Sequence, residues 1–255
     1  MCLMAKPEIK TSSSLVMPEA SHSEATAACW SCGDMRAAHF CSACGKVQPP
    51  APVDYFTFYG LPRKLNVDVS RLEKEFYALS RKLHPDLYSQ SDSREQTWSL
   101  EKSSQLNDAY RTLKDPIKRT EYLLKLEGVE LEEQSKAATE KARTTGEVKK
   151  QVLPPDLLEE VFELNMQLEE ARMNKKMGEN DPALLRDLET QRVSLEQKHE
   201  ALFDELKSYW NEWDRFVDSG KEEERLTIHN KMVDVLNRRN YIRNLVRDVN
   251  EALES

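Results

Sequence analysis

The chain has 255 residues, a formal net charge of −8 and 32% charged residues. That length allows one or two domains with their own cores, and the acidic balance argues against a dedicated nucleic-acid-binding protein, which normally carries a basic surplus. The sequence has only seven glycines and no apolar run of the ~18 residues that a membrane-spanning helix needs, so we expect a mainly helical protein without a membrane span.

Residues 1–28 are rich in Ser and Ala and contain Glu8, Glu19 and Glu24 but no Arg. They lack the apolar core of a signal peptide and the Arg-rich pattern of an organelle import sequence. We therefore predict a disordered tail and a cytoplasmic location.

Two Cys-x-x-Cys-Gly pairs follow, in which eight residues separate the pairs and the cysteines are Cys29, Cys32, Cys41 and Cys44. Two such turns supply four thiolates for a tetrahedral site, and a site closed by four protein ligands is structural rather than catalytic. We predict bound zinc in residues 29–46, although the spacing does not separate zinc from iron. A redox pair normally lies beside a βαβ pattern, and a disulfide framework requires export; neither condition is met here. His39 breaks the spacing, so we do not predict it as a ligand.

A helical hairpin is predicted within residues 54–128, after a proline-rich linker. Asp68 fits the N-cap of a first helix, whose apolar residues recur at steps of three and four. These residues are Val69, Leu72, Phe76, Leu79 and Leu83. A second helix ends at Asp115-Pro116 and carries on one side Leu100, Ser103, Leu106, Tyr110 and Leu113.

The sequence His84-Pro85-Asp86 lies between these helices. The first helix must stop before Pro85, because proline disfavours α geometry in the residue ahead of it. The fixed φ of proline makes a rigid corner, on which Asp86 can present a carboxylate to an arginine of a partner. The alternatives are a helix C-terminus in which His84 satisfies the last carbonyls, and a catalytic His–Asp pair, for which no Ser, Cys or third orienting group is placed nearby.

Lys74, Arg81 and Lys82 fall mostly off the apolar stripe of the first helix. They make its outer face basic, and such a face steers encounter with an acidic surface.

The basic helix, the His-Pro-Asp corner and residues 107–116, NDAYRTLKDP, together resemble the J-domain of co-chaperones. Residues 119–124, RTEYLL, narrow the resemblance to the HscB (Jac) group, co-chaperones of iron–sulfur cluster assembly, and the tetracysteine head is similar to that of its eukaryotic and some bacterial members. The resemblance extends from about residue 29 to the C-terminus and is most specific over residues 81–126. It implies that His84, Pro85 and Asp86, with the basic face, bind a DnaK/HscA-type chaperone and stimulate its ATPase.

Residues 129–153 form a polar connector rich in Glu and Lys, and three long helical patterns follow in residues 154–255. The first begins at Pro154-Pro155-Asp156, the second at Asp181-Pro182, and the third after a break at Ser219-Gly220. Short breaks between amphipathic helices predict an antiparallel three-helix bundle, while the heptads leave an intermolecular coiled coil open. The predicted fold is thus all-α: a J-domain hairpin plus a C-terminal bundle, with a small zinc-binding segment before them.

The first bundle helix carries two apolar stripes. One is the core seam Leu157, Val161, Leu164, Leu168 and Ala171. The second contains Leu158, Phe162 and Met166 and is bordered by Glu163 and Glu170. An exposed apolar strip rimmed by carboxylates is typical of a partner surface, although a wide core face is the alternative.

The resemblance to HscB-like proteins implies that this second stripe binds the U-type iron–sulfur scaffold through Leu158, Phe162, Glu163, Met166 and Glu170. An aromatic residue on the last helix, here Tyr241, matches a further contact. Glu159 stands where the family pattern often has an apolar residue, so we leave it out.

The predicted function is that of a non-enzymatic co-chaperone that delivers the scaffold to its chaperone, in the cytoplasm or, in a eukaryotic source, in the mitochondrial matrix. The main alternative is a general J-protein whose bundle binds unfolded clients or mediates oligomerisation; such a protein should expose a broad, weakly polar surface instead of a narrow mixed strip. A redox or metal-transfer enzyme that uses the cysteines is a further alternative. We expect no nucleic-acid or membrane partner and leave weak self-association open.

Overall fold

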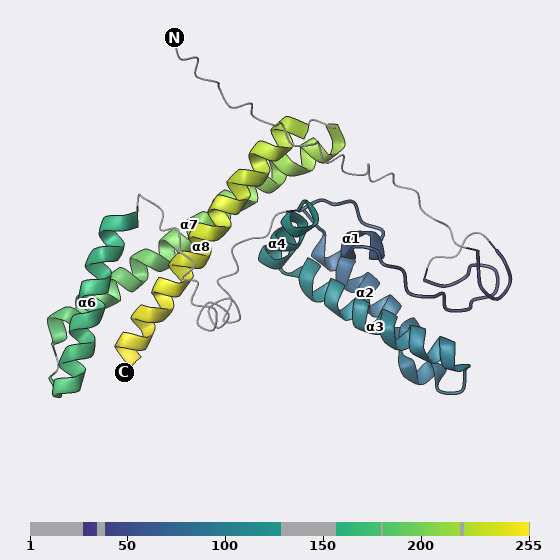
Figure 1. Ribbon diagram of the computed structural model, residues 1–255, viewed down its shortest axis with the longest axis horizontal. Coiled ribbons are helices and arrows are strands. Elements are labelled where there is room, and N and C mark those ends of the chain that lie inside the picture. The colour runs from purple at the N-terminus through teal and green to yellow at the C-terminus, as the bar shows by residue number, and fades with distance from the viewer. Residues whose placement is uncertain (1–27, 35–38, 129–156, 180, 220–221, 255) are drawn as a thin grey trace, which may run out of the picture. The chain divides into compact units, whose positions relative to one another are not determined.

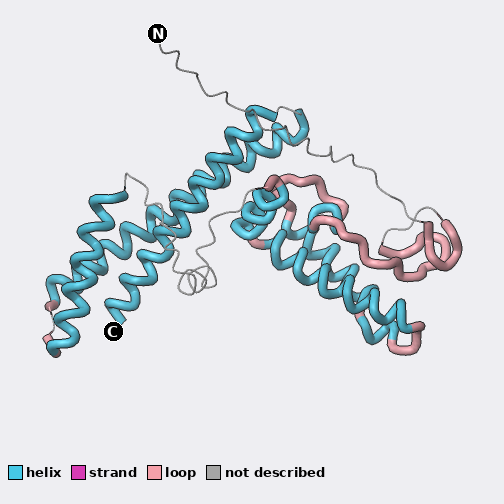
Figure 2. Tube along the Cα trace, in the orientation of Figure 1, coloured by secondary structure: helices cyan, strands magenta, loops and turns pink. Residues whose placement is uncertain are grey.

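The structure is a computed structural model that describes residues 28–34, 39–128, 157–179, 181–219 and 222–254 (Figure 1). The chain divides into two compact units, residues 1–50 and residues 51–255. The predicted connector, the Pro154-Pro155-Asp156 start and all but one residue of the predicted tail lie outside the described residues. Within the described ranges every regular element is a helix, and the single strand-like feature is an isolated bridge between Phe40 and Val47 (Figure 2).

The second unit begins with a helical hairpin. Its elements are α1 (Tyr55–Phe58), α2 (Val69–Leu83), the 3-10 helix η1 (Pro85–Tyr88), α3 (Ser93–Lys114) and α4 (Pro116–Leu126). Aspartates cap all four α-helices: Asp54 accepts from the backbone N–H of Thr57 and Asp68 from that of Arg71, and Asp92 and Asp115 cap α3 and α4 in the same way. Each cap satisfies N–H groups that have no partner inside the helix, which explains why the helices begin where they do.

Helices α2 and α3 pack against each other through the predicted apolar stripe of α2. The rings of Phe76 and Tyr110 stack with their centroids 4.1 Å apart, and Leu83 and Leu106 are buried. The prediction for Leu100 was wrong, because 62% of its side chain is exposed. The buried face of α3 is rotated by one residue at this end and contains Ser99, Lys102, Leu106, Ala109 and Leu113.

The C-terminal part contains α6 (Leu158–Met177), α7 (Pro182–Ser219) and α8 (Glu222–Glu254). Asp181 caps α7 by accepting from the backbone N–H groups of Ala183 and Leu184 at 2.9 and 3.2 Å. Gly178, with a φ of 71°, ends α6 in the left-handed conformation that favours glycine. Helices α7 and α8 run antiparallel, and α6 lies along one half of the pair (Figure 1).

Two hydrophobic cores lie along the α7–α8 pair, and each contains one half of it. The first contains buried residues of α6, of the N-terminal half of α7 and of the C-terminal half of α8, and it is the core of the predicted three-helix bundle. The second contains buried residues of the hairpin together with the other halves of α7 and α8, among them Phe56, Leu65 and Trp213. This second core was not predicted, and in it the hairpin takes the place that a third bundle helix would fill.

Polar contacts accompany the second core. Oδ1 of Asp214 on α7 accepts a hydrogen bond from the backbone N–H of Leu65 at 2.7 Å, and Oδ2 accepts one from the N–H of Asn66 at 3.0 Å. The indole N–H of Trp213 donates to the carbonyl of Arg63. These bonds pair backbone groups of the loop before α2 that no helix or sheet would satisfy.

Candidate functional sites: a metal centre and two docking surfaces

The four predicted cysteines converge in the first unit. Sγ of Cys29 lies 3.7 Å from Sγ of Cys44, and Sγ of Cys32 lies 3.6 Å from that of Cys41. All four sulfurs lie within 4.8 Å of one another. A tetrahedral ion with metal–sulfur bonds of about 2.3 Å separates its ligands by about 3.8 Å, so the spacing fits a four-thiolate site. The thiols are free rather than joined in disulfides, and His39 is not a member of the cluster.

The two Cys-x-x-Cys turns have the same backbone geometry. In each, the N–H of the glycine donates to the carbonyl of the first cysteine at 2.9 Å, in Gly33 to Cys29 and in Gly45 to Cys41. Both glycines have a positive φ, of 77° and 72°. That conformation is strained for residues with a Cβ, which explains why glycine follows each second cysteine.

A buried amide supports one of the ligands. The side-chain N–H of Gln48, which is 4% exposed, donates to Sγ of Cys29 at 3.4 Å. Burial raises the pKa of the Cys29 thiol, but hydrogen bonds from the backbone of Cys32 and Ser31 and from Gln48 outweigh it and lower the pKa to about 6. This arrangement favours the thiolate, which is the form that binds a metal. Gln48 was not predicted, because no spacing rule connects it to the cysteines.

The His-Pro-Asp corner is an exposed, tightly turned segment between α2 and η1. His84 ends α2 with an extended ψ of 126°, as the following proline requires, and Pro85 opens η1. Nδ1 of His84 accepts from the backbone N–H of Asp86 at 3.3 Å, and the side chains of His84 and Asp86 are 57% and 89% exposed. The corner therefore presents both side chains to solvent and uses neither in the core.

Three hydroxyl groups hold the end of α2 just before this corner. The hydroxyls of Ser99 and Ser103 on α3 both donate to the carbonyl of Leu83, at 2.7 and 2.8 Å, and the hydroxyl of Tyr88 donates to the carbonyl of Lys82 at 3.0 Å. The last carbonyls of a helix have no intrahelical partner, so these bonds fix where α2 stops. Among the residues that position the corner, sequence reasoning missed Ser99 and Tyr88.

The predicted basic residues lie on the solvent face of α2. Lys74, Arg81 and Lys82 are all exposed, and Tyr77 lies between them with 55% of its side chain exposed. The face that approaches the corner is therefore basic, with one aromatic ring at its centre.

Helix α6 buries one of its two apolar stripes and exposes the other. Val161, Leu164 and Leu168 are 2–5% exposed and pack in the three-helix core. Leu158, Phe162 and Met166 are 57%, 65% and 60% exposed, and Glu163 and Glu170 are exposed beside them. The second stripe is thus not part of the core.

The structure does not bring Tyr241 to this exposed stripe. Tyr241 is 9% exposed and belongs to the core cluster that contains Val161 and Leu164. Burial raises the pKa of its hydroxyl. We therefore correct its predicted role from a surface contact to a packing residue beneath α6.

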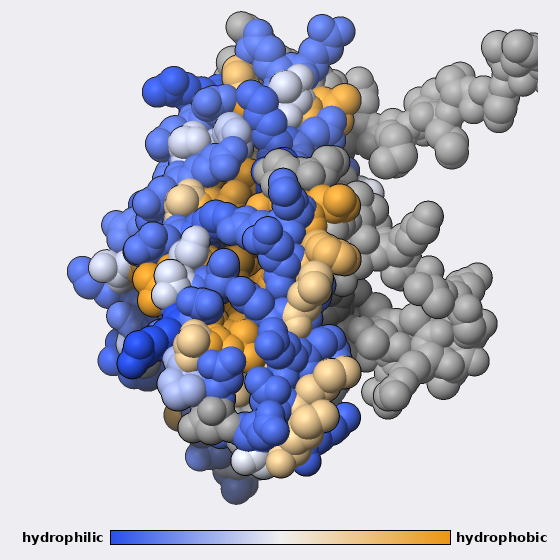
Figure 3. Space-filling view, turned by 90° about the vertical axis from the view of Figure 1, so that its left-hand side faces the viewer, coloured by the Kyte–Doolittle hydropathy of each residue, from blue (hydrophilic) through white to orange (hydrophobic). Residues whose placement is uncertain are grey.

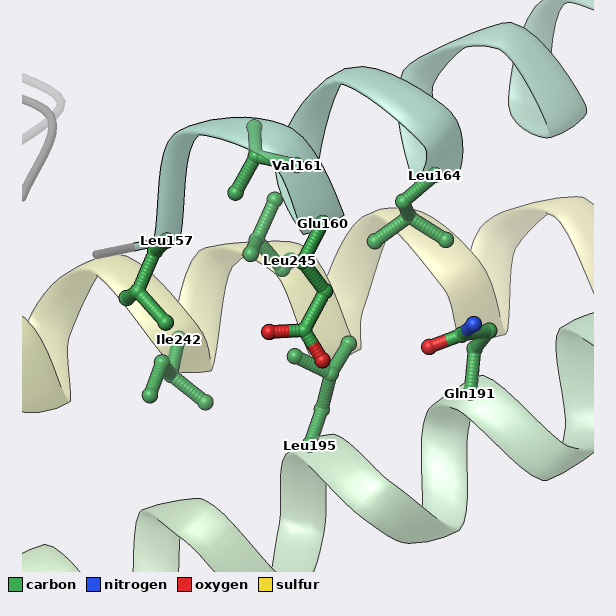
Figure 4. A pocket seen from close by; sticks show the side chains of 8 residues that line it. All are labelled: Leu157, Glu160, Val161, Leu164, Gln191, Leu195, Ile242 and Leu245. Carbon is green, nitrogen blue, oxygen red and sulfur yellow. The ribbon is translucent and has the colours of Figure 1, made fainter. Parts of the chain in front are cut away.

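A small cavity lies between α6 and the α7–α8 pair (Figure 4). It is lined mainly by aliphatic side chains, and the carboxylate of Glu160 beside it pairs with Lys198 of α7. Its volume of about 10 Å³ is at the lower limit for one water molecule. It is too small to be a ligand site.

None of the helices in the described ranges is both long enough and apolar enough to cross a membrane.

The DnaJ domain family matches residues 54–122. The mouse iron-sulfur cluster co-chaperone protein HscB is 43% identical over 111 residues, which are 41% of this chain and 47% of the mouse protein. The human protein of the same name is 36% identical over 157 residues, which are 59% of this chain and 61% of the human protein. The matched regions thus span about half of these curated relatives.

The crystal structure of human co-chaperone protein HscB resembles this fold with a TM-score of 0.58 and 25% identity, and covers 87% of this chain and 96% of that structure. The DnaJ match, together with the helical hairpin and its exposed His-Pro-Asp corner, defines a J-domain protein. Within that class the chain belongs to the HscB type, as the curated relatives and the likeness to the human structure show. The resemblance drawn from the sequence is confirmed on both points.

Proposed function

We propose that this protein is a co-chaperone of iron–sulfur cluster biogenesis that binds a U-type scaffold protein and delivers it to a DnaK/HscA-type chaperone. The observation that carries the proposal is the presence of two different exposed surfaces in one HscB-type chain, the His-Pro-Asp corner with its basic face and the apolar strip on α6. The curated relatives are named as iron–sulfur cluster co-chaperones, which supports the pathway.

The corner is the surface that we assign to the chaperone. Asp86 offers an exposed carboxylate to a cation of the chaperone, and Lys74, Arg81 and Lys82 offer complementary charge to an acidic surface. Binding there stimulates the ATPase of the chaperone. In this proposal the protein catalyses no reaction of its own and acts by binding to the chaperone.

The strip on α6 is the surface that we assign to the scaffold. Phe162 is its largest side chain, and aromatic anchors with a polar rim are typical of interface centres. The strip is one residue wide and bordered by Glu163 and Glu170. A general client-binding protein would need a broader apolar surface, so the narrow, charged strip favours a specific partner.

The four cysteines form a metal site, for which we propose structural zinc. The sulfur spacing fits a closed tetrahedral site, and all four positions are taken by protein thiolates. Zinc bound there would supply folding free energy to a segment that is too small for a core of its own.

A pull-down with matched variants tests the proposal. Wild-type protein in lysate of the source organism should capture both a DnaK-type chaperone and the U-type scaffold, each identified by mass spectrometry. The Asp86→Asn bait should lose the chaperone and keep the scaffold, whereas the Phe162→Ala bait should do the reverse. Capture of unfolded or ribosomal clients with neither protein enriched would reject the adaptor role.

A further inference from the structure

The exposed apolar strip of α6 continues beyond the residues that the resemblance assigns. Met173 and Met177, in the last two turns of the helix, are 57% and 71% exposed. They are as exposed as Leu158 and Phe162 at its start. Because residues three, four and seven apart lie on one face of a helix, Phe162, Met166, Met173 and Met177 belong to one row. Figure 3 shows this face of the molecule with a broken row of apolar side chains, orange and then paler, along its right-hand edge. From Leu158 to Met177 the strip extends over about 29 Å of helix.

A row of carboxylates borders the strip on one side. Glu159, Glu163 and Glu170 follow one another at steps of four and seven, and all three are exposed. The neighbouring Glu160 and Glu169 are paired with Lys198 and Arg172. In the described part of the chain, by contrast, no ion pair involves any of the three carboxylates of the row.

We propose that the whole length of α6 is one docking surface, which takes a partner surface with an apolar ridge flanked on one side by Lys or Arg. This inference rests on the proposed function, since it assigns that surface to the same scaffold partner. It adds Met173 and Met177 as distal contacts and Glu159 as an electrostatic contact. Methionine suits such a place, because its unbranched, polarisable side chain adapts to the partner's shape.

The charges argue against an antiparallel pairing of α6 with α6 of a second copy of the chain. An isologous pair brings the same surface patch of two subunits together. In an antiparallel pair of α6 helices the acidic side of one strip would lie beside the acidic side of the other. A partner with basic side chains avoids this repulsion, and we therefore assign the strip to such a partner.

Isothermal titration of the full chain with the U-type scaffold protein of the same organism tests the inference. Met173 and Met177 are exposed, so the double variant Met173→Ala/Met177→Ala should keep the melting temperature of the wild type, and its Kd should rise by about fivefold or more. Leu226→Ala is the matched control, since Leu226 on α8 is 60% exposed but lies off the strip, and its Kd should not change. Glu159→Gln should weaken the salt dependence of the Kd, because it removes one charge from the rim.

The outcomes separate this inference from the proposed function. Weaker binding by both Phe162→Ala and the double methionine variant, with Leu226→Ala unchanged, supports the long surface. Weaker binding by Phe162→Ala alone limits the surface to the first half of α6, which overturns the inference and leaves the proposed function intact. Unchanged binding by both rejects the proposed scaffold site as well. If sedimentation shows a dimer that the methionine variant abolishes, the strip is an interface between copies and the inference is wrong.

Discussion

The backbone N–H of Leu65 donates a hydrogen bond to the carboxylate of Asp214 over 2.7 Å, although 149 positions separate the two residues in the chain. Leu65 is fully buried, and the loop that contains it packs on α7. The J-domain hairpin is thus held to the long α7–α8 pair by a hydrophobic core and by directed polar bonds. The two proposed docking surfaces belong to one packed unit.

Replacement of Asp214 tests this attachment. Asp214→Ala removes the acceptor for the N–H groups of Leu65 and Asn66, and we expect the free energy of unfolding to fall by about 1–3 kcal/mol. Asp204→Ala on the same helix is the control, since Asp204 is 69% exposed and pairs with Lys207 one turn away; its effect should stay within about 0.5 kcal/mol. Chemical denaturation measures both. Equal effects in the two variants would show that the Asp214 bonds contribute no stability.

The hydroxyl pair on α3 should position the His-Pro-Asp corner. In the double variant Ser99→Ala/Ser103→Ala the carbonyl of Leu83 loses both donors, and we expect a stability loss of about 1 kcal/mol for each bond. We also expect a several-fold fall in stimulation of the chaperone ATPase, because the end of α2 is no longer fixed. Ser104→Ala, at an exposed position of the same helix, should change neither quantity. Full stimulation by the double variant at a temperature where it remains folded would show that the hydroxyls do not position the corner.

Removal of one thiolate tests the metal centre. Metal analysis should find one zinc per chain in the wild type and none in Cys32→Ser, because three ligands leave the site open. Residues 29–46 of the variant should become sensitive to protease while the helical circular dichroism signal remains, since the cysteines lie in a separate compact unit. Equal protease resistance of this segment in metal-free and metal-bound protein would contradict a structural role for the ion.

Two aromatic residues of the bundle should respond in opposite ways to truncation. Tyr241 is 9% exposed in the core beneath α6, so Tyr241→Ala should cost about 3–5 kcal/mol of unfolding free energy. Phe162 is 65% exposed, so Phe162→Ala should change stability little while it weakens scaffold binding by about 1 kcal/mol or more. Thermal melts and binding titrations on both variants check this contrast. A large fall in melting temperature for Phe162→Ala with unchanged affinity would show that the second stripe is part of the core.

The sequence predicted best what neighbouring residues determine. The caps at Asp68 and Asp181 and the two stripes of α6 follow from local hydrogen bonding and helical periodicity, and the structure contains them. The prediction for Leu100 was wrong because Ser99 takes the buried position beside it, and the bond of Ser99 to Leu83 is a tertiary contact that no local pattern indicates.

Tertiary packing also explains the other differences. Tyrosine occurs on both exposed and buried helix faces, so the residue type of Tyr241 does not predict its location. The packing of α6 on α8 buries it. The second core joins Phe56 and Leu65 to Trp213, which are far apart in the chain, and no periodicity in either segment indicates the pairing. Gln48 was missed for the same reason, since its bond to Cys29 depends on the folded head.

The ATPase rate of the DnaK-type chaperone, with and without scaffold, tests the central claim of two independent surfaces most directly. Wild-type protein should stimulate hydrolysis, and added scaffold should increase the rate further. Asp86→Asn keeps the size of an exposed side chain but removes its charge, and should abolish stimulation in both conditions. Phe162→Ala should retain the stimulation seen without scaffold and lose only the increase that scaffold adds. Unchanged stimulation by Asp86→Asn, or an undiminished scaffold effect with Phe162→Ala at limiting scaffold, would contradict the account.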